Sequence, residues 1–230
     1  MIFHPPSWLP PISKTLSTAT TVGEFVLRGD PHKQEDDEPI TLVSAATQKT
    51  KTNRQLAEDV EALAAGLAND LGWSPNEETT QVPGKVIAVL CENSVDYLTY
   101  CWATHRLRAT CLLLHASTLL AENAQHIKHS GCNVLILSST LLESGRVLMT
   151  AVGDASLRVY LAHSGLNGFA KCDFFRDNKT ISDLLNVGRA RGPLPALSWS
   201  PEEAQSSIAY LCATSGTSGA QVMKCSVALF

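Results

Sequence analysis

The segment Tyr210-Leu211-Cys212-Ala213-Thr214-Ser215-Gly216-Thr217-Ser218-Gly219 joins an apolar run to a turn rich in glycine and hydroxyl groups. We predict a buried β-strand over residues 206–213, directly before the turn. Glycines let the backbone turn tightly and bring N–H groups close to an anion. The side chains of Thr214, Ser215, Thr217 and Ser218 add hydroxyl donors. Such a turn suits phosphate oxygens, although a plain Ser/Gly surface loop fits the same composition.

The spacing of this turn excludes several common motifs. The GxxxxGK[ST] pattern is absent, and Gly216 and Gly219 are not followed by the third glycine of GxGxxG. Ser215 has no nearby His or Asp in a GxSxG frame, so a hydrolase nucleophile is not indicated. On the residues alone, the phosphate-binding loop and the surface loop both remain open.

Upstream of the turn, apolar runs alternate with helical patterns. Continuous apolar strands joined by crossover helices are typical of a parallel sheet covered on both faces. We predict strands over residues 40–45, 85–91, 110–115, 134–137, 157–161 and 206–213. We predict helices over residues 52–72, 93–107, 120–130, 141–150 and 181–187, with Asn93 or Ser94 as the cap of the second. The expected fold class is therefore α/β, a mostly parallel sheet flanked by helices.

The helix over residues 52–72 has the clearest pattern. Its apolar residues recur at a period near 3.6, so they line one face; they are Leu56, Val60, Leu63, Ala64 and Leu67. Thr52 and Gln55 have the spacing of a capping box. Gly72 follows as the expected left-handed end.

Composition and charge narrow the class of protein. The formal net charge is −4 and 44% of residues are hydrophobic, which indicates an ordinary globular chain without a basic nucleic-acid surface. The seven cysteines form no CxxC pair, so we interpret them as small buried apolar residues in a reducing compartment. The N-terminus lacks a signal peptide pattern and no apolar run is long enough to span a membrane. We expect a cytoplasmic protein; the peroxisome stays an alternative, although Ala228-Leu229-Phe230 is not a peroxisomal tripeptide.

The turn over Thr214-Ser215-Gly216-Thr217-Ser218-Gly219 resembles the signature loop of the adenylate-forming superfamily, the AMP-forming acyl-CoA ligases and their relatives. The order of upstream segments is similar to that family as well. These are the helix over 52–72, the strand and Glu92-Asn93-Ser94 start over 85–97, and the segments 105–117 and 121–137. The resemblance covers about residues 40–221. It implies an irregular lead-in over 1–38, a partial AMP-binding domain over 39–222 and a non-matching tail over 223–230.

The resemblance also implies an activity. Family members activate a small carboxylic acid with ATP and Mg to an acyl-adenylate, and pass the acyl group to coenzyme A. Thr214, Ser215, Gly216, Thr217, Ser218 and Gly219 then hold ATP phosphates, while no catalytic residue or metal ligand is assigned. The family's later motifs and mobile C-terminal domain lie beyond Phe230, so we expect an incomplete enzyme, truncated after the loop, that associates with itself through exposed apolar surface. The alternative is a non-catalytic remnant or a nucleotide-binding interaction module of the same fold.

Two departures from the family stand out. The lysine that usually follows the second loop glycine is replaced by Val222, with Lys224 two residues further on. The family's glycine before the third strand is matched to Ala109, with Arg108 beside it.

Three histidines are weaker site candidates. His126 and His129 are three apart on one predicted helix, but a solvated helix face explains them better than a metal pair. His115 stands at a predicted strand end, where we favour a satisfied buried histidine over a functional one. A doubly wound nucleotide-binding domain unrelated to ligases is a third hypothesis, which the order of the segments disfavours.

Overall fold

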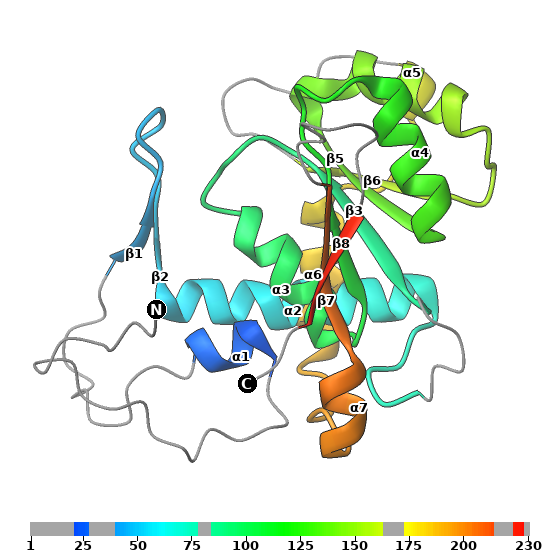
Figure 1. Cartoon of the computed structure of the whole chain (residues 1–230). Coiled ribbons are helices and arrows are strands. Elements are labelled where there is room, and N and C mark those ends of the chain that lie inside the picture. Colours follow the sequence, from blue (N-terminus) through cyan, green and yellow to red (C-terminus); the bar gives the residue numbers. More distant parts are fainter. Residues whose placement is uncertain (1–20, 28–39, 78–83, 163–172, 214–222, 228–230) are drawn as a thin grey trace, which may run out of the picture.

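The computed structural model describes residues 21–27, 40–77, 84–162, 173–213 and 223–227. Its centre is a six-stranded sheet with the order β6-β5-β3-β4-β7-β8. The strands are β3 (Val86–Leu90), β4 (Thr110–Leu113), β5 (Val134–Ser138), β6 (Arg158–Ala162), β7 (Ile208–Ala213) and β8 (Met223–Val227). The first five strands in this list are parallel to one another. Strand β8, at the edge, pairs antiparallel with β7. The predicted α/β fold with a mostly parallel sheet is confirmed (Figure 1).

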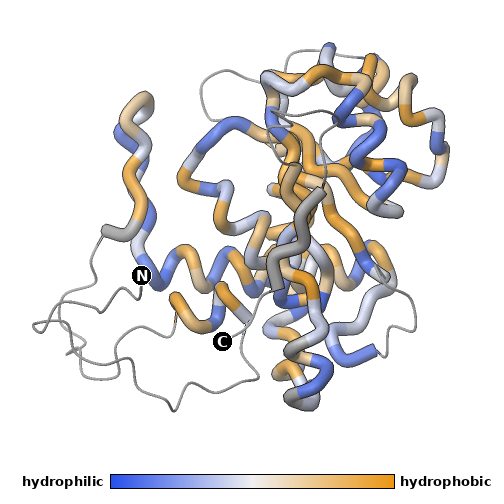
Figure 2. The backbone as a smooth tube through the Cα atoms, in the orientation of Figure 1, coloured by the Kyte–Doolittle hydropathy of each residue, from blue (hydrophilic) through white to orange (hydrophobic). Residues whose placement is uncertain are grey.

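Helices cover both faces of this sheet. Successive side chains of a strand point to opposite faces, and in β3 Ile87 and Val89 enter one core cluster while Val86, Ala88 and Leu90 enter the other. The first cluster packs under α2 (Asn53–Leu71), α3 (Tyr97–Arg106) and α6 (Ile181–Arg191). The second packs under α4 (Leu120–Ser130) and α5 (Leu142–Val152). Figure 2 shows the apolar residues concentrated along the strands between these two helical layers.

Helix α2 forms where the sequence places it. Thr52 and Gln55 make the predicted capping box, and Gly72 ends the helix in the left-handed conformation with φ 69°. The predicted apolar face is buried in the first core cluster. Within the described residues no helix combines the length and apolar character needed to cross a bilayer.

Helix α3 begins later than predicted. The prediction placed its cap at Asn93 or Ser94, but the helix starts at Tyr97 and no side chain caps it. Asp96, at the cap position, is drawn away from the helix by Lys51, whose Nζ lies 2.6 Å from its carboxylate, and by Lys49 at 3.1 Å. Two ion pairs therefore outweigh a local cap.

Among the described α-helices and β-strands, four were not predicted. They are α1 (Val22–Leu27), β2 (Thr50–Thr52), α7 (Pro201–Ser206) and β8. Helix α1 makes part of the predicted lead-in regular, and Thr21 and Glu24 cap each other at its start. The predicted strand over 40–45 is β1 (Ile40–Val43), but it pairs only with β2, outside the main sheet.

Candidate functional site

The carboxyl ends of five parallel strands meet at one edge of the sheet. Strand β7 ends at Ala213, so the predicted strand leads directly into Thr214. Ala213 pairs with Met223 of β8, which places both ends of the segment 214–222 at this edge. The predicted site residues Thr214, Ser215, Gly216, Thr217, Ser218 and Gly219 lie outside the described residues, as does Val222.

The strand order identifies where an open parallel sheet normally binds ligands. From β3 the chain moves to β4 on one side, whereas from β5 it moves to β6 on the other. The carboxyl ends of neighbouring strands β3 and β5 therefore flank a topological switch point, where a crevice forms in folds of this kind.

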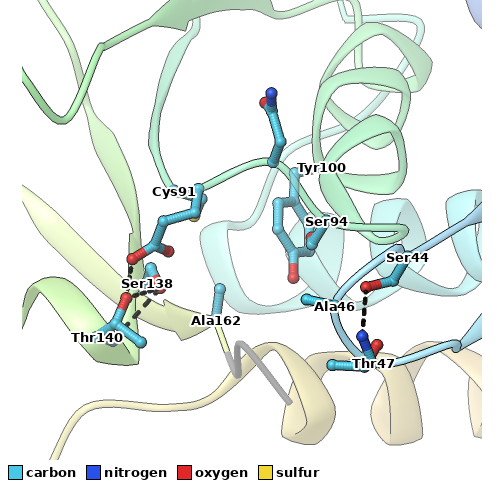
Figure 3. Close-up of a pocket in the computed structure, with 11 residues that line it drawn as sticks. Ser44, Ala46, Thr47, Cys91, Ser94, Tyr100, Ser138, Thr140 and Ala162 are labelled. Carbon is cyan, nitrogen blue, oxygen red and sulfur yellow. Dashed lines mark hydrogen bonds between the residues drawn. The ribbon is translucent and has the colours of Figure 1, made fainter. Parts of the chain in front are cut away.

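A pocket of about 140 Å³ occupies this position. In Figure 3, Ser138, Thr140 and Ala162 lie on one side of it, and Ser44, Ala46 and Thr47 on the other. The segment after β3 lines it too, with Cys91, Glu92, Asn93 and Ser94, and Tyr100 of α3 completes the lining. Glu92 is the one charged residue among them, and its carboxylate repels a phosphate group.

Glu92 is the charged group of the pocket. Burial opposes ionisation of its carboxyl, but hydrogen bonds from Ser138 and Thr140 outweigh it and hold its pKa below the usual value. The Thr140 hydroxyl donates to Glu92 Oε1. The carboxylate joins the ends of β3 and β5, which differs from the predicted role of Glu92-Asn93-Ser94 as a helix cap. An ionised carboxylate surrounded by hydroxyl groups suits a hydrogen-bond donor or a cation, not an anion.

The histidine candidates differ from their predictions. His115 follows β4 and is exposed rather than buried, with its Nδ1 2.7 Å from Ser117 Oγ. His126 is buried, not on a solvated face, and burial lowers its pKa, whereas His129 on the same helix is exposed. Within the described part of the chain, no three His, Cys, Asp or Glu side chains are grouped to hold a metal ion.

Three of the five described cysteines, Cys101, Cys111 and Cys132, are buried as predicted, whereas Cys91 and Cys212 are half-buried. Cys91, Cys101, Cys111, Cys132 and Cys212 are free thiols. Burial raises the pKa of the Cys132 thiol to about 12 and raises that of Cys91 as well. These thiols are therefore protonated and unreactive near neutral pH.

The residues that hold the approach to β7 were not among the predicted site residues. The end of α3 and the turn after it contribute His105, Arg106, Arg108 and Thr110, and each contacts the segment between Leu194 and Ala209. Arg106 and His105 are buried. The sequence signal that could have indicated them is the presence of polar residues inside the apolar run from Trp102 to Leu114.

One residue of this turn has a left-handed backbone. It is Arg108, at φ 54°, next to Ala109, to which the glycine of the family was matched. Glycine is favoured at such a position because it has no Cβ. The left-handed residue before β4 is therefore Arg108, and a non-glycine residue occupies it.

Comparisons with known proteins agree with this architecture. The sequence matches the AMP-binding enzyme family over residues 30–221. It is 35% identical over 228 residues to "Acyl-CoA ligase easD" of Emericella nidulans, covering 96% of this chain and 39% of that protein. It is 32% identical to "Acyl-CoA ligase cm3C" of Cordyceps militaris, covering 96% of this chain and 36% of that protein. The chain thus spans less than two fifths of the length of these curated relatives.

Solved structures share the fold at lower identity. The anthranilate CoA ligase AuaEII, in complex with anthranoyl-AMP, superimposes with a TM-score of 0.68 at 15% identity, covering 92% of this chain and 35% of that one. MbtA of Mycobacterium smegmatis gives a TM-score of 0.60 at 20% identity, covering 80% of this chain and 30% of that one. With a family match over most of its length and a parallel sheet of this topology, the chain belongs to the AMP-binding enzyme family.

Proposed function

We propose that this chain takes part in the ATP-dependent activation of a small carboxylic acid to an acyl-adenylate and then to an acyl-CoA thioester. Membership of the AMP-binding enzyme family supports the first step. The second rests on the relatives from Emericella nidulans and Cordyceps militaris, both called acyl-CoA ligases. Because the chain spans less than two fifths of those proteins, the whole reaction is proposed for the chain in combination with the regions its relatives have in addition.

In the first step a carboxylate oxygen attacks the α-phosphorus of ATP, and pyrophosphate leaves with the electron pair of the broken P–O bond. In the second, the thiol of coenzyme A loses its proton and attacks the acyl carbonyl, and AMP leaves. Attack at phosphorus depends mainly on positioning and charge stabilisation. We assign the phosphates of ATP to Thr214, Ser215, Gly216, Thr217, Ser218 and Gly219, whose hydroxyl and backbone N–H donors suit anionic oxygens. Mg and coenzyme A belong to the proposed reaction, and we assign no residue of this chain to either.

The observation that supports this assignment best is the pairing of Ala213 with Met223. Strands β7 and β8 bring the two ends of the segment 214–222 together at the carboxyl edge, where parallel sheets bind ligands. The pocket beside β3 and β5 carries a carboxylate and no cation, which leaves the β7 end as the better place for phosphate.

Equilibrium binding of ATP to the purified chain tests this assignment. We expect binding that Gly216→Val weakens at least tenfold, since the added side chain keeps backbone donors away from the phosphates. Ser156→Ala is the matched control: Ser156 is an exposed hydroxyl residue in the turn before β6 and should leave binding unchanged. Equal affinity of the Gly216→Val variant and the unaltered chain would remove the loop from the nucleotide site.

A nucleotide-binding module without turnover is the second candidate, favoured by Val222 at the position where the family usually has lysine. Loss of that cation weakens phosphate neutralisation. Carboxylate-dependent exchange of pyrophosphate into ATP separates the two candidates. We expect no exchange by the chain alone, and exchange by a chimera in which it replaces the matching part of the Emericella relative. A chimera that binds ATP but does not catalyse exchange would favour the module.

Self-association belongs to the same proposal. The exposed large apolar side chains include Phe25 on α1, Val43 on β1 and Leu119 before α4, each on a different element. Sedimentation of the purified chain over a hundredfold range of concentration measures its oligomeric state. A monomer throughout would contradict association.

A further inference from the structure

We propose that the end of helix α3 and the turn into β4 form a positioning clamp for strand β7, made by His105, Arg106, Arg108 and Thr110. The clamp fixes where β7 ends, and so where the loop that begins at Thr214 is presented. This inference rests on the proposed phosphate-binding role of that loop. The clamp residues are positioning residues, since their described contacts are with the approach to β7.

Two of them hold the first carbonyls of β7. Thr110 Oγ1 donates to the carbonyl of Ile208 at 3.0 Å, and His105 Nε2 lies 3.1 Å from the carbonyl of Ala209. The ladder between β7 and β8 pairs Ile208 with Val227 and Tyr210 with Ser226, so it skips Ala209. A residue skipped in this way is a bulge, where the regular pairing with β8 is interrupted. His105 contacts the carbonyl of this bulged residue.

The state of the His105 ring is fixed by this contact. A carbonyl only accepts, so Nε2 carries the hydrogen and Nδ1 is left with a lone pair that has no partner. The side chain is 3% exposed, and burial lowers its pKa to about 4, so the ring is neutral near neutral pH. Tyr210 of β7 packs against it edge-on, with centroids 4.6 Å apart. His105 therefore contacts β7 at two consecutive residues.

Arg106 holds the chain before it reaches β7. Its Nη2 donates to the carbonyls of Leu194 and Pro195, each at 2.9 Å, and its Nε donates to Glu61 of α2 at 2.5 Å. The side chain is 5% exposed. A buried guanidinium is costly unless its hydrogen bonds are satisfied; Nε and Nη2 have partners, whereas Nη1 has none among the described residues. Its two carbonyl contacts fix an irregular stretch that has no ladder of its own.

Arg108 holds helix α7, between that stretch and β7. Its Nη2 lies 3.0 Å from Glu203 Oε1, and its guanidinium lies 5.3 Å from the ring centroid of Trp199. Its backbone has φ 54°, a conformation that non-glycine residues adopt at a cost. The side-chain contacts offset that cost. Four residues from the end of α3, the turn after it and the start of β4 thus contact the approach to β7 at five points in chain order: Leu194, Pro195, Glu203, Ile208 and Ala209.

The test compares two threonine substitutions. Thr110→Val keeps the shape and removes the bond to Ile208, whereas Thr104→Val removes a buried bond of the same type, from Thr104 Oγ1 to the Tyr100 carbonyl inside α3 at 2.8 Å. Native-state hydrogen exchange is measured for the amides of β7 and β5. We expect Thr110→Val to speed exchange in β7 about fivefold relative to β5, the factor for one typical hydrogen bond. Thr104→Val should leave the ratio unchanged. Equal ratios in the two variants would overturn the clamp.

The histidine adds a rescue experiment. His105→Leu removes the donor to Ala209, and His105→Gln restores an N–H at similar reach. We expect faster β7 exchange in the leucine variant and partial recovery in the glutamine variant; no difference between them would count against the role of His105.

Binding of ATP is measured on the same proteins. If the unaltered chain binds, Thr110→Val and His105→Leu should raise the dissociation constant about fivefold, and Thr104→Val should not. An unaltered chain without ATP binding would contradict the proposed function, while the exchange ratios still decide on the clamp.

Discussion

Strands β5 and β7 run in the same direction in one sheet, but they contact the rest of the molecule through different chemistry. All five residues of β5 are buried, and Leu135, Ile136 and Leu137 are completely inaccessible. In β7 only Ala209 and Leu211 are buried, and two of its carbonyls accept hydrogen bonds from side chains of the α3–β4 turn.

The difference follows from what each strand must do. Apolar burial is non-directional and tolerates small shifts along the strand axis, whereas hydrogen bonds require a donor and acceptor within a few tenths of an ångström. Strand β5 supports the sheet, so burial is sufficient. Strand β7 precedes the proposed phosphate loop, and its end must be fixed along the axis.

Ile136→Ala should cause the largest loss of stability. The side chain is fully buried in the first core cluster, and replacing such an isoleucine leaves a cavity that costs about 4 kcal/mol. Urea unfolding measures the loss. Val187→Ala on α6, where the valine is exposed, is the control and should cost under about 0.5 kcal/mol. A loss below about 1 kcal/mol at Ile136 would contradict the view that burial holds β5.

Gly188→Ala should cost somewhat less, about 3 kcal/mol, because overpacking against backbone forces two helices apart. A Cβ at Gly188 would lie 1.7 Å from the Ala62 carbonyl oxygen, where α6 crosses α2. Gly145→Ala is the control, since the three atoms nearest to its Cβ all belong to the Leu137 side chain, which can shift more easily than backbone. Thermal unfolding should show the larger shift for Gly188; equal shifts would mean that the crossing is not tightly packed.

Lowering the pH should decrease the stability of the fold through His105, which contacts β7. Burial holds its folded pKa at about 4, below the reference value of 6.5, so the unfolded chain binds more protons between these values. Stability is full above pH 6.5 and is lost as pH falls toward 4, by about 2 kcal/mol between pH 7 and pH 5.

Urea unfolding at several pH values measures this slope. His105→Gln should flatten it. His126→Gln is the control on the other face of the sheet. Burial lowers the pKa of His126 as well, so this variant should remove its own contribution to the pH dependence of stability, and the two contributions should add. A slope unchanged by His105→Gln would show that His105 does not titrate as its burial implies.

The elements of the sheet were predictable because local pattern and tertiary role agree in them. The capping box at Thr52, the left-handed Gly72 and the apolar run over Val134–Ser138 each carry their own signal. Helix α7 also had a local signal, since Ser200 and Glu203 form a capping box and Pro201 follows the cap. The surrounding prolines nevertheless suggested an irregular stretch.

The clamp and the start of α3 were not predictable in the same way. Arg106 and Leu194 are far apart in sequence, and only the fold brings the guanidinium to that carbonyl. Likewise, Asp96 has the composition of a helix cap, but Lys51 binds its carboxylate from an element 45 residues away. Long-range polar contacts of this kind leave no periodic trace, whereas apolar faces do.

Arg108 gives the smallest expected change in stability and the sharpest distinction between backbone and side chain. Arg108→Gly relieves a left-handed residue, a gain of about 1 kcal/mol. It also removes the ion pair with half-exposed Glu203 and the contact with Trp199, which lowers stability. The two effects should nearly cancel in the free energy of unfolding.

Arg108→Gln separates them, because it keeps the strained backbone and loses the charge. We expect it to lower stability in urea unfolding, and to speed hydrogen exchange over α7 as much as Arg108→Gly does, since both lose the same contacts. Equal stability of the two variants would show that the left-handed backbone carries no strain. Because α7 precedes β7, a glycine variant that is stable overall yet less protected over α7 would show that arginine serves position there rather than stability.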